Sequence, residues 1–239
     1  MNQLKIILII TGILLSSCHD TVTTDEKIIK TGNKMIENDS EIEYLALGDS
    51  YTIGESVDPS LRWPVQLVER LRKDSVNIAD AEIIAQTGWT TDELMQGIES
   101  AGPGNDYDLV SLLIGVNNQY RGRDIYNFRE ELAGLINVAI RKADSVAENV
   151  IVLSIPDWGV MPFASGRDGN KIAEEIDAFN NVVKEECNYA GIKFFDITEI
   201  SRRAAYDQSL IAGDGLHPSG KMYGLWAGKI YSHVYELLK

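Results

Sequence analysis

The segment Leu45-Ala46-Leu47-Gly48-Asp49-Ser50-Tyr51-Thr52 decides how the rest of the chain is interpreted. An apolar run that ends at a glycine and continues into a polar turn is typical of a buried strand followed by a loop. A serine in such a loop lies at the carboxyl end of its strand, where open α/β sheets bind their ligands. Because Gly-Asp-Ser is also an ordinary turn composition, the remaining sequence must decide whether Ser50 has a chemical role.

The composition is that of an ordinary globular protein, with 44% hydrophobic and 24% charged residues among 239. This length fits one α/β domain. The formal net charge is −14. It argues against nucleic acid or an anionic membrane surface as the main partner, because both attract Lys and Arg. Nothing in the composition indicates an oligomeric state.

The first 17 residues have the character of an export signal. Lys5 precedes an apolar run, residues 6–15, that is too short to span a bilayer as a stable helix. The run ends in Leu15-Ser16-Ser17-Cys18, which resembles a bacterial lipobox and so implies cleavage before Cys18 and lipidation of its thiol. A plain secretory signal with an incidental cysteine is the alternative.

This interpretation divides the chain into three parts. We expect a lipoprotein signal peptide over 1–17, a lipid-anchored polar tether over 18–41 and a folded domain over 42–239. The protein would then be an exported bacterial lipoprotein of the cell envelope, in contact with the membrane only through Cys18. Cys187 would be the one free thiol, and its place on an apolar helical stripe predicts a core residue.

Strand-like and helix-like segments alternate through the predicted domain. Short apolar runs predict five strands, over 43–47, 81–85, 109–114, 150–155 and 192–195. Helical periodicity predicts helices over about 63–71, 92–99, 126–147, 172–187 and 221–238, with Thr91 capping the second and Gly191 ending the fourth. This alternation predicts a three-layer α/β/α sandwich with a flavodoxin-like, mostly parallel five-stranded sheet.

Polar segments stand where the loops of such a sheet would meet. Ser50 follows the first strand, Gly88 follows the second, and Asn117 follows the third in Gly115-Val116-Asn117-Asn118. Before the last helix stands Asp214-Gly215-Leu216-His217-Pro218. Together they supply a hydroxyl nucleophile, a close backbone N–H, an amide donor and a histidine beside a carboxylate. These groups are what acyl transfer through a tetrahedral oxyanion requires.

These segments, in this order, resemble the SGNH (GDSL-type) hydrolase family over residues 42–239. The resemblance implies that Ser50 is the nucleophile, that His217 transfers protons and that Asp214 orients the imidazole. It also implies an oxyanion hole formed by the backbone N–H groups of Ser50 and Gly88 and the side-chain amide of Asn117. The implied reaction is hydrolysis of a carboxylic ester, either acyl or O-acetyl, through an acyl-enzyme, with no cofactor and no metal.

The third segment departs from the family pattern, because Asn118 stands where an aspartate is usual. Asn117 is intact, so we expect the change to alter loop hydrogen bonding more than the chemistry. The implied substrates are small-molecule, carbohydrate or lipid esters. A non-catalytic carbohydrate- or lipid-binding lipoprotein is one alternative, and a thioesterase or acyltransferase using the same residues is another.

Some residues near the predicted loops have two interpretations. Four aromatic residues either line the substrate cleft or simply pack: Trp89, Tyr120, Trp158 and Phe163. His233 falls in the last predicted helix and is expected to be structural. The sequence lacks a phosphate-binding Gly-Lys-Ser/Thr ending, a Gly-x-Ser-x-Gly elbow and the His or Cys spacing of a metal site.

Overall fold

The computed structural model describes residues 41–239, so the predicted signal peptide, Cys18 and all but the last residue of the predicted tether lie outside the described residues. Five parallel strands form one sheet in the order β2-β1-β3-β4-β5. The strands are β1 (Tyr44–Gly48), β2 (Glu82–Ala85), β3 (Leu109–Leu113), β4 (Val150–Leu153) and β5 (Lys193–Phe195). This order is the flavodoxin-like arrangement that the sequence predicts.

Strands β1, β3 and β4 form the buried centre of the sheet. Every residue of these three strands is buried, as expected of parallel strands that are covered on both faces. The register places Leu45 beside Glu82 on one side and Val110 on the other. It also brings Gly48 level with Ala85 and Leu113, so β1, β2 and β3 end together at one edge.

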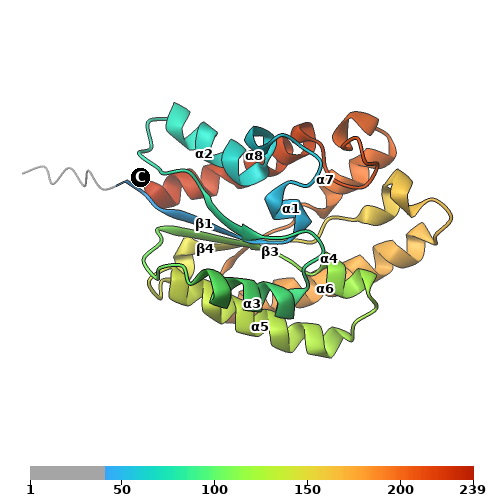
Figure 1. The fold of residues 1–239 in the computed structure, drawn as a ribbon, viewed down its shortest axis with the longest axis horizontal. Helices are drawn as coiled ribbons and strands as arrows, with labels where there is room; N and C mark the ends of the chain where they lie inside the picture. The colour runs from blue at the N-terminus through green and yellow to red at the C-terminus, as the bar shows by residue number, and fades with distance from the viewer. Residues whose placement is uncertain (1–40) are drawn as a thin grey trace, which may run out of the picture. The chain divides into compact units, whose positions relative to one another are not determined.

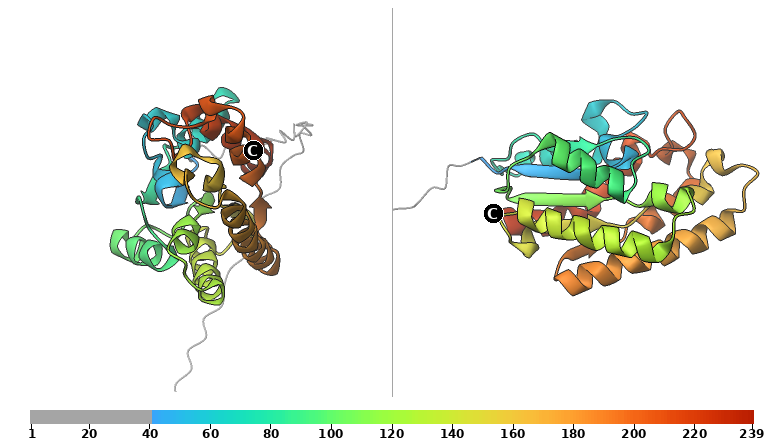
Figure 2. Two further views of the ribbon diagram at one scale, coloured as in Figure 1. Left: turned by 90° about the vertical axis from the view of Figure 1, so that its right-hand side faces the viewer. Right: turned by 60° about the horizontal axis from the view of Figure 1, so that its bottom comes forward.

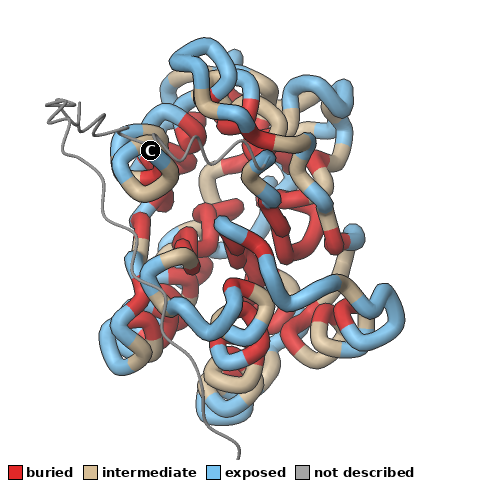
Figure 3. The backbone as a smooth tube through the Cα atoms, turned by 90° about the vertical axis from the view of Figure 1, so that its left-hand side faces the viewer, coloured by how far each residue is buried: buried red, intermediate tan, exposed pale blue. Residues whose placement is uncertain are grey.

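Helices cover both faces of the sheet (Figure 1). Helices α2 (Trp63–Lys73) and α8 (Gly220–Leu238) lie on one face. Helices α3 (Thr91–Ala101), α5 (Ile125–Lys142) and α6 (Gly169–Ala190) lie on the other, side by side in the right-hand view of Figure 2. The tube coloured by burial shows buried residues on the strands and on the inward sides of the helices (Figure 3). The three-layer sandwich is therefore present.

Helices α2 and α8 approach closely because α8 carries glycine at the contact. A Cβ on Gly224 would lie 2.8 Å from Oε1 of Gln66, so a larger residue would have to displace the Gln66 side chain. Arg70 Nη2 donates to the Gly224 carbonyl at 2.8 Å, and Gln66 Nε2 donates to the Gly220 carbonyl at 2.8 Å. Trp63 and Trp226, one from each helix, are fully buried. This pairing fixes one face of the sandwich.

Several boundaries differ from the sequence prediction. Thr90, not Thr91, is the N-cap of α3, in a capping box with Glu93. The predicted helix to residue 147 ends at Lys142, because Asp144 and Ser145 have positive φ, which an α-helix excludes. Gly191 does end α6, in the left-handed conformation expected of a C-cap.

Short helices that the sequence analysis did not predict occupy the loops. Three are α-helical: α1 (Ser50–Ile53), α4 (Val116–Tyr120) and α7 (Thr198–Arg202). The others are single 3₁₀ turns: η1 (Pro59–Leu61), η2 (Ala147–Asn149), η3 (Trp158–Val160), η4 (Pro162–Ala164), η5 (Arg203–Ala205) and η6 (Gln208–Leu210). Within residues 41–239, none of the helices has the length and apolar character needed to cross a bilayer.

Candidate active site

Ser50 begins helix α1 directly after β1. The side chain of Asp49 caps this helix by accepting a hydrogen bond from the Tyr51 N–H at 3.0 Å. Residue 48 must be glycine here, because a Cβ would lie 2.2 Å from Thr52 Oγ1 and 2.5 Å from the Leu113 carbonyl oxygen. The N–H groups of a first helical turn have no partner in the helix ladder. The Ser50 N–H, at the first position of α1, therefore has no partner within the helix.

His217 is held by Asp214 in the loop before α8. Nδ1 of His217 lies 2.6 Å from Oδ2 of Asp214, and Oδ1 of Asp214 accepts the backbone N–H groups of Leu216 and His217, both at 2.9 Å. Ser56 donates its hydroxyl to Oδ2 at 2.7 Å. A carboxylate that accepts from Nδ1 places the imidazole proton there and leaves Nε2 as the free base.

The electrostatics of Asp214 suit this role. Partial burial raises the pKa of its carboxyl, but hydrogen bonds from His217, Ser56 and two backbone N–H groups outweigh burial and hold that pKa well below its usual range. Asp214 is therefore ionised at neutral pH. Ser56 was not identified from the sequence, because it reaches Asp214 from 158 positions away.

Gly88 lies in the loop after β2 with φ +89°, a conformation that favours glycine. Side chains from other segments hold this loop. Arg121 Nη2 donates to the Gly88 carbonyl at 2.7 Å, and Asn117 Nδ2 donates to the Trp89 carbonyl at 2.9 Å. Thr87 Oγ1 donates to Glu55 at 2.5 Å. The position of the Gly88 N–H thus depends on α4 and on the segment after α1.

Asn118 faces away from this loop and into the protein. It is fully buried, and its Oδ1 accepts the Thr91 N–H at 3.1 Å while its Nδ2 donates to Thr91 Oγ1 at 2.6 Å. Thr91 Oγ1 also donates to Glu131. Asn118 therefore joins α4 to the start of α3. Its amide supplies both an acceptor and a donor to Thr91, where an aspartate could only accept.

The predicted site segments meet in one pocket at the carboxyl edge of the sheet, the edge that faces the viewer on the left of Figure 2. Its volume is about 170 Å³. Ser50, Gly88, Asn117 and His217 all line it, and His217 is its only charged or titratable side chain apart from the tyrosines. Asp214 lies behind His217. The structure therefore brings together the residues that the resemblance names, from segments up to 167 positions apart.

One wall of the pocket is aromatic. Tyr120, Trp158 and Phe163 line it and contact each other, with ring centroids 5.4 to 6.4 Å apart. Trp89 does not line this pocket; its ring packs over Gly97 of α3. Three of the four aromatic candidates thus belong to the cleft, and the fourth is a packing residue. His233 and the buried Cys187 also lie outside the pocket.

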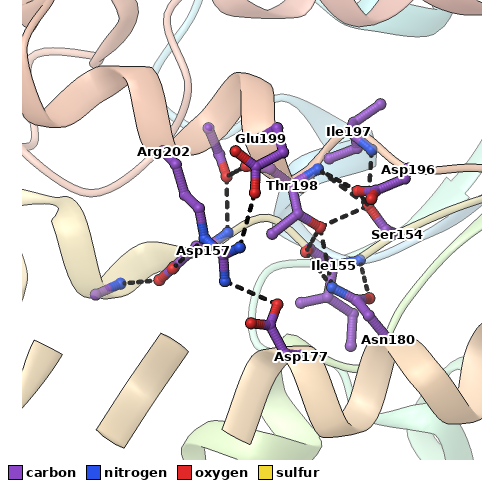
Figure 4. A network of polar contacts seen from close by, with 12 residues as sticks. Ser154, Ile155, Asp157, Asp177, Asn180, Asp196, Ile197, Thr198, Glu199 and Arg202 are labelled. Carbon is purple, nitrogen blue, oxygen red and sulfur yellow. Dashed lines mark hydrogen bonds and ion pairs between the residues drawn. The ribbon is translucent and has the colours of Figure 1, made fainter. Parts of the chain in front are cut away.

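A polar network holds the loop that carries Trp158 (Figure 4). Asp157 is almost fully buried; its Oδ1 accepts the Gly159 N–H at 2.8 Å, and its Oδ2 pairs with Arg202 at 3.0 Å. Arg202 also pairs with Asp177 and Glu199. Trp158 Nε1 donates to Gln119 Oε1 at 2.8 Å. The aromatic wall is therefore rigidly supported, by residues that no motif in the sequence identifies.

Asp49 is the buried acid next to Ser50. Burial raises the pKa of its carboxyl to about 7, against the lowering effect of its backbone hydrogen bonds. It does not line the pocket, and its contact with the Tyr51 N–H places it in support of α1. Its role in the structure is to shape the turn that carries Ser50.

Comparisons with known proteins show the family and the fold. The model of the GDSL-like Lipase/Acylhydrolase family matches residues 46–225. No curated protein matches the chain. Among solved structures, TesA is similar with a TM-score of 0.65 at 19% identity, covering 82% of this chain and 99% of that one.

Two further solved structures are esterases by their descriptions. The psychrotrophic esterase EstA from a Pseudoalteromonas species, inhibited by monoethylphosphonate, has a TM-score of 0.63 at 15% identity and covers 83% of this chain and 99% of its own. A variant of Axe2, an acetyl xylan esterase from Geobacillus stearothermophilus, has a TM-score of 0.59 at 18% identity, with coverages of 82% and 95%. At these identities the likeness concerns the fold.

The fold is of the α/β class, and the family match identifies a hydrolase of ester bonds. The family match covers most of the chain, and the chain belongs to the GDSL-like lipase/acylhydrolase family.

Proposed function

We propose that the chain hydrolyses carboxylic esters through an acyl-enzyme on Ser50, with His217 and Asp214 completing a catalytic triad. The observation that carries the proposal is the convergence of Ser50, Gly88, Asn117 and His217 on one pocket, with Asp214 bound to Nδ1 of His217. This arrangement supplies a nucleophile, a base whose Nε2 is free to accept a proton, and a carboxylate that orients the base. These are the three roles in a catalytic triad.

In the proposed reaction, Ser50 Oγ attacks the ester carbonyl carbon while His217 Nε2 takes the serine proton. The tetrahedral intermediate collapses, the C–O bond to the alcohol breaks, and the imidazolium gives its proton to the departing alcohol. Water then attacks the acyl-enzyme while His217 takes its proton. The bond between the acyl carbon and Ser50 Oγ breaks, the imidazolium returns the proton to Ser50 Oγ, and the carboxylic acid leaves. Asp214 remains ionised throughout and stabilises the imidazolium.

The oxyanion of each intermediate would be bound by the backbone N–H groups of Ser50 and Gly88 and by Asn117 Nδ2. The hydrogen bond from Asn117 Nδ2 to the Trp89 carbonyl fixes the amide and leaves its second N–H for the ligand. Donors fixed in advance are effective because they do not have to reorient during the reaction, and losing one typically costs about 2.7–4 kcal/mol of transition-state stabilisation.

The size of the pocket favours short acyl groups. Its volume of about 170 Å³ compares with a cavity of roughly 150 Å³ that accommodates benzene. An acetyl to butyryl ester fits this space beside the catalytic groups, whereas a long acyl chain would extend into solvent. We expect kcat/KM to fall from acetyl and butyryl esters to long-chain esters of the same alcohol.

The decisive test replaces the proposed nucleophile and base. Ser50→Ala and His217→Ala should each lower kcat on 4-nitrophenyl acetate by at least about a thousandfold, because each removes a member of the triad. His233→Ala is the matched histidine control and should retain wild-type activity, since His233 lies on α8 outside the pocket. Full activity of Ser50→Ala would disprove the mechanism.

A covalent inhibitor tests the same proposal independently. A fluorophosphonate should form an adduct on Ser50 that peptide mass spectrometry locates, and the adduct should be absent from His217→Ala because the serine is no longer activated. An adduct on another residue would refute the assignment of Ser50.

We also propose that the protein is an exported lipoprotein tethered through Cys18. The support is the Leu15-Ser16-Ser17-Cys18 sequence after an apolar run, followed by a polar stretch up to the start of the domain. Such a tether would place the pocket outside the cytoplasm, with access to small-molecule, carbohydrate or lipid esters.

A further inference from the structure

Arg167 stands over the aromatic wall of the pocket. Its guanidinium carbon lies 5.0 Å from the ring centroid of Tyr120, 5.2 Å from that of Trp158 and 5.7 Å from that of Phe163. Its Nη2 donates to the Tyr120 hydroxyl at 3.1 Å. Stacking on several rings holds a guanidinium in place without using its N–H donors.

The backbone around Arg167 is also fixed. The Arg167 N–H donates to the Ala164 carbonyl at 2.9 Å, and the next residue, Asp168, caps α6 by accepting the Lys171 N–H at 3.1 Å. The backbone that carries Arg167 is therefore held on both sides, and the side chain itself is exposed.

Arg167 keeps its charge available. Among residues 41–239 no carboxylate lies within ion-pair distance of it, whereas Arg121, which contacts the Gly88 loop, is paired with Glu93 at 3.0 Å. The Tyr120 hydroxyl takes one of its five N–H donors. Arg167 does not itself line the pocket; it lies against the three aromatic side chains that do, and no arginine or lysine is among the lining residues. Within residues 41–239, Arg167 is therefore a cation beside the aromatic wall with no carboxylate partner.

The position of the wall relates Arg167 to the leaving alcohol. The Phe163 N–H donates to the Gly215 carbonyl at 3.0 Å, so the turn that carries Phe163 is bound to the loop of His217. His217 is the residue that would protonate the departing alcohol. The aromatic wall is thus joined to the loop of the group that would protonate the alcohol.

We propose that Arg167 and the aromatic wall of Tyr120, Trp158 and Phe163 form a subsite for an alcohol part that carries an anionic oxygen group, a carboxylate or a phosphate. This inference rests on the proposed function, because it names the substrate class of the same site. The ring or chain of the alcohol lies on the aromatic wall, and the guanidinium donates two N–H groups to the anion, the geometry in which arginine recognises such groups.

Three acetate esters of matched size test the subsite: 4-acetoxybenzoate, 4-acetoxybenzamide and 4-acetoxyphenyl phosphate. The measured quantity is kcat/KM for each anionic ester divided by kcat/KM for the neutral amide. Comparing this ratio between wild type and variant cancels the intrinsic reactivity of the esters. Arg167→Gln should lower at least one of the two anionic ratios by about five- to tenfold, the size expected for a hydrogen-bonded charge pair at a partly exposed site.

Two further variants sharpen the comparison. Arg141→Gln removes an exposed arginine of α5 that does not line the pocket, and it should leave both ratios at the wild-type value. Arg167→Lys keeps the charge but not the planar fork, and it should restore part of the loss. The wild-type ratios should also fall as salt is raised from 0.05 to 0.5 M, because exposed charges are screened within about 10 Å at 0.1 M.

The outcomes separate this proposal from the proposed function. A loss confined to the carboxylate or to the phosphate ratio supports the subsite and identifies the anion. Equal ratios in wild type and Arg167→Gln, or the same loss in Arg141→Gln, would overturn the subsite while leaving ester hydrolysis intact. If Ser50-dependent turnover were absent for all three esters, the proposed function itself would be wrong.

Discussion

Arg121 links the loop of Gly88 to helix α3. Its guanidinium donates to the Gly88 carbonyl at 2.7 Å and pairs with Glu93 at 3.0 Å. Glu93 is in turn part of the α3 capping box with Thr90. The Gly88 N–H is one of the proposed oxyanion donors, and such donors are sensitive to displacements of an ångström or less. Arg121 is therefore a positioning residue.

Replacement of Arg121 by Gln should lower kcat about tenfold on 4-nitrophenyl acetate and change KM less than twofold, because a misplaced oxyanion donor weakens the transition state more than substrate binding. Steady-state kinetics measures both constants. Arg123→Gln is the control, since Arg123 pairs with Asp92 and not with the Gly88 loop. An effect on KM alone, or equal losses in both variants, would contradict the positioning role.

The end of β4 and helix α6 are joined by the side-chain amide of Asn180. Its Oδ1 accepts the Ile155 N–H at 2.7 Å and its Nδ2 donates to the Ile155 carbonyl at 2.9 Å (Figure 4). Strand β4 ends at Leu153, so Ile155 lies beyond the strand, and Asn180 replaces the neighbouring strand as its partner. The loop carrying Asp157 and Trp158 starts from this point.

Asn180→Ala should lower the free energy of unfolding by about 2–3 kcal/mol, because it leaves the buried Ile155 N–H without its partner. Urea denaturation of wild type and variant measures the difference. Asn181→Ala, at the exposed neighbouring position, should change the free energy of unfolding by less than about 0.5 kcal/mol. A neutral Asn180→Ala would show that the amide does not stabilise this junction.

The molecule as a whole combines an acidic domain with a proposed lipid anchor. A net charge of −14 gives no electrostatic attraction to anionic lipid. Membrane association would therefore depend on the lipid at Cys18 rather than on the surface of the domain.

Cys18→Ser should move the protein from the membrane fraction to the soluble exported fraction, with kcat/KM on a small ester unchanged. Fractionation followed by immunoblotting measures the location of the protein, and an activity assay measures kcat/KM. Cys187→Ala is the matched control and should stay with the membrane, because Cys187 is buried in α6. A Cys18→Ser protein that still sediments with membranes would rule out the anchor.

Strand positions and sheet order were accessible from local patterns. A parallel strand buried on both faces is apolar throughout, and Leu109–Leu113 shows this directly. The first residue of a helix is harder to predict from sequence where two neighbouring residues can cap it equally well. Thr90 and Thr91 can both cap, and the choice follows from distant contacts, since Asn118 and Glu131 engage the Thr91 hydroxyl and leave Thr90 as the cap.

The fold class and the residue types at the pocket are predictable from the chain, because periodicity, glycine positions and the order of polar segments are properties of neighbouring residues. The contacts that support and surround those residues become visible only in the folded molecule. Two of these contacts join segments far apart along the chain: Ser56 reaches Asp214 across 158 positions, and Arg121 reaches the Gly88 carbonyl across 33. A third contact, Arg167 over the aromatic wall, brings several rings together at once. Such contacts depend on how the loops converge after the sheet has formed, and no local pattern records them.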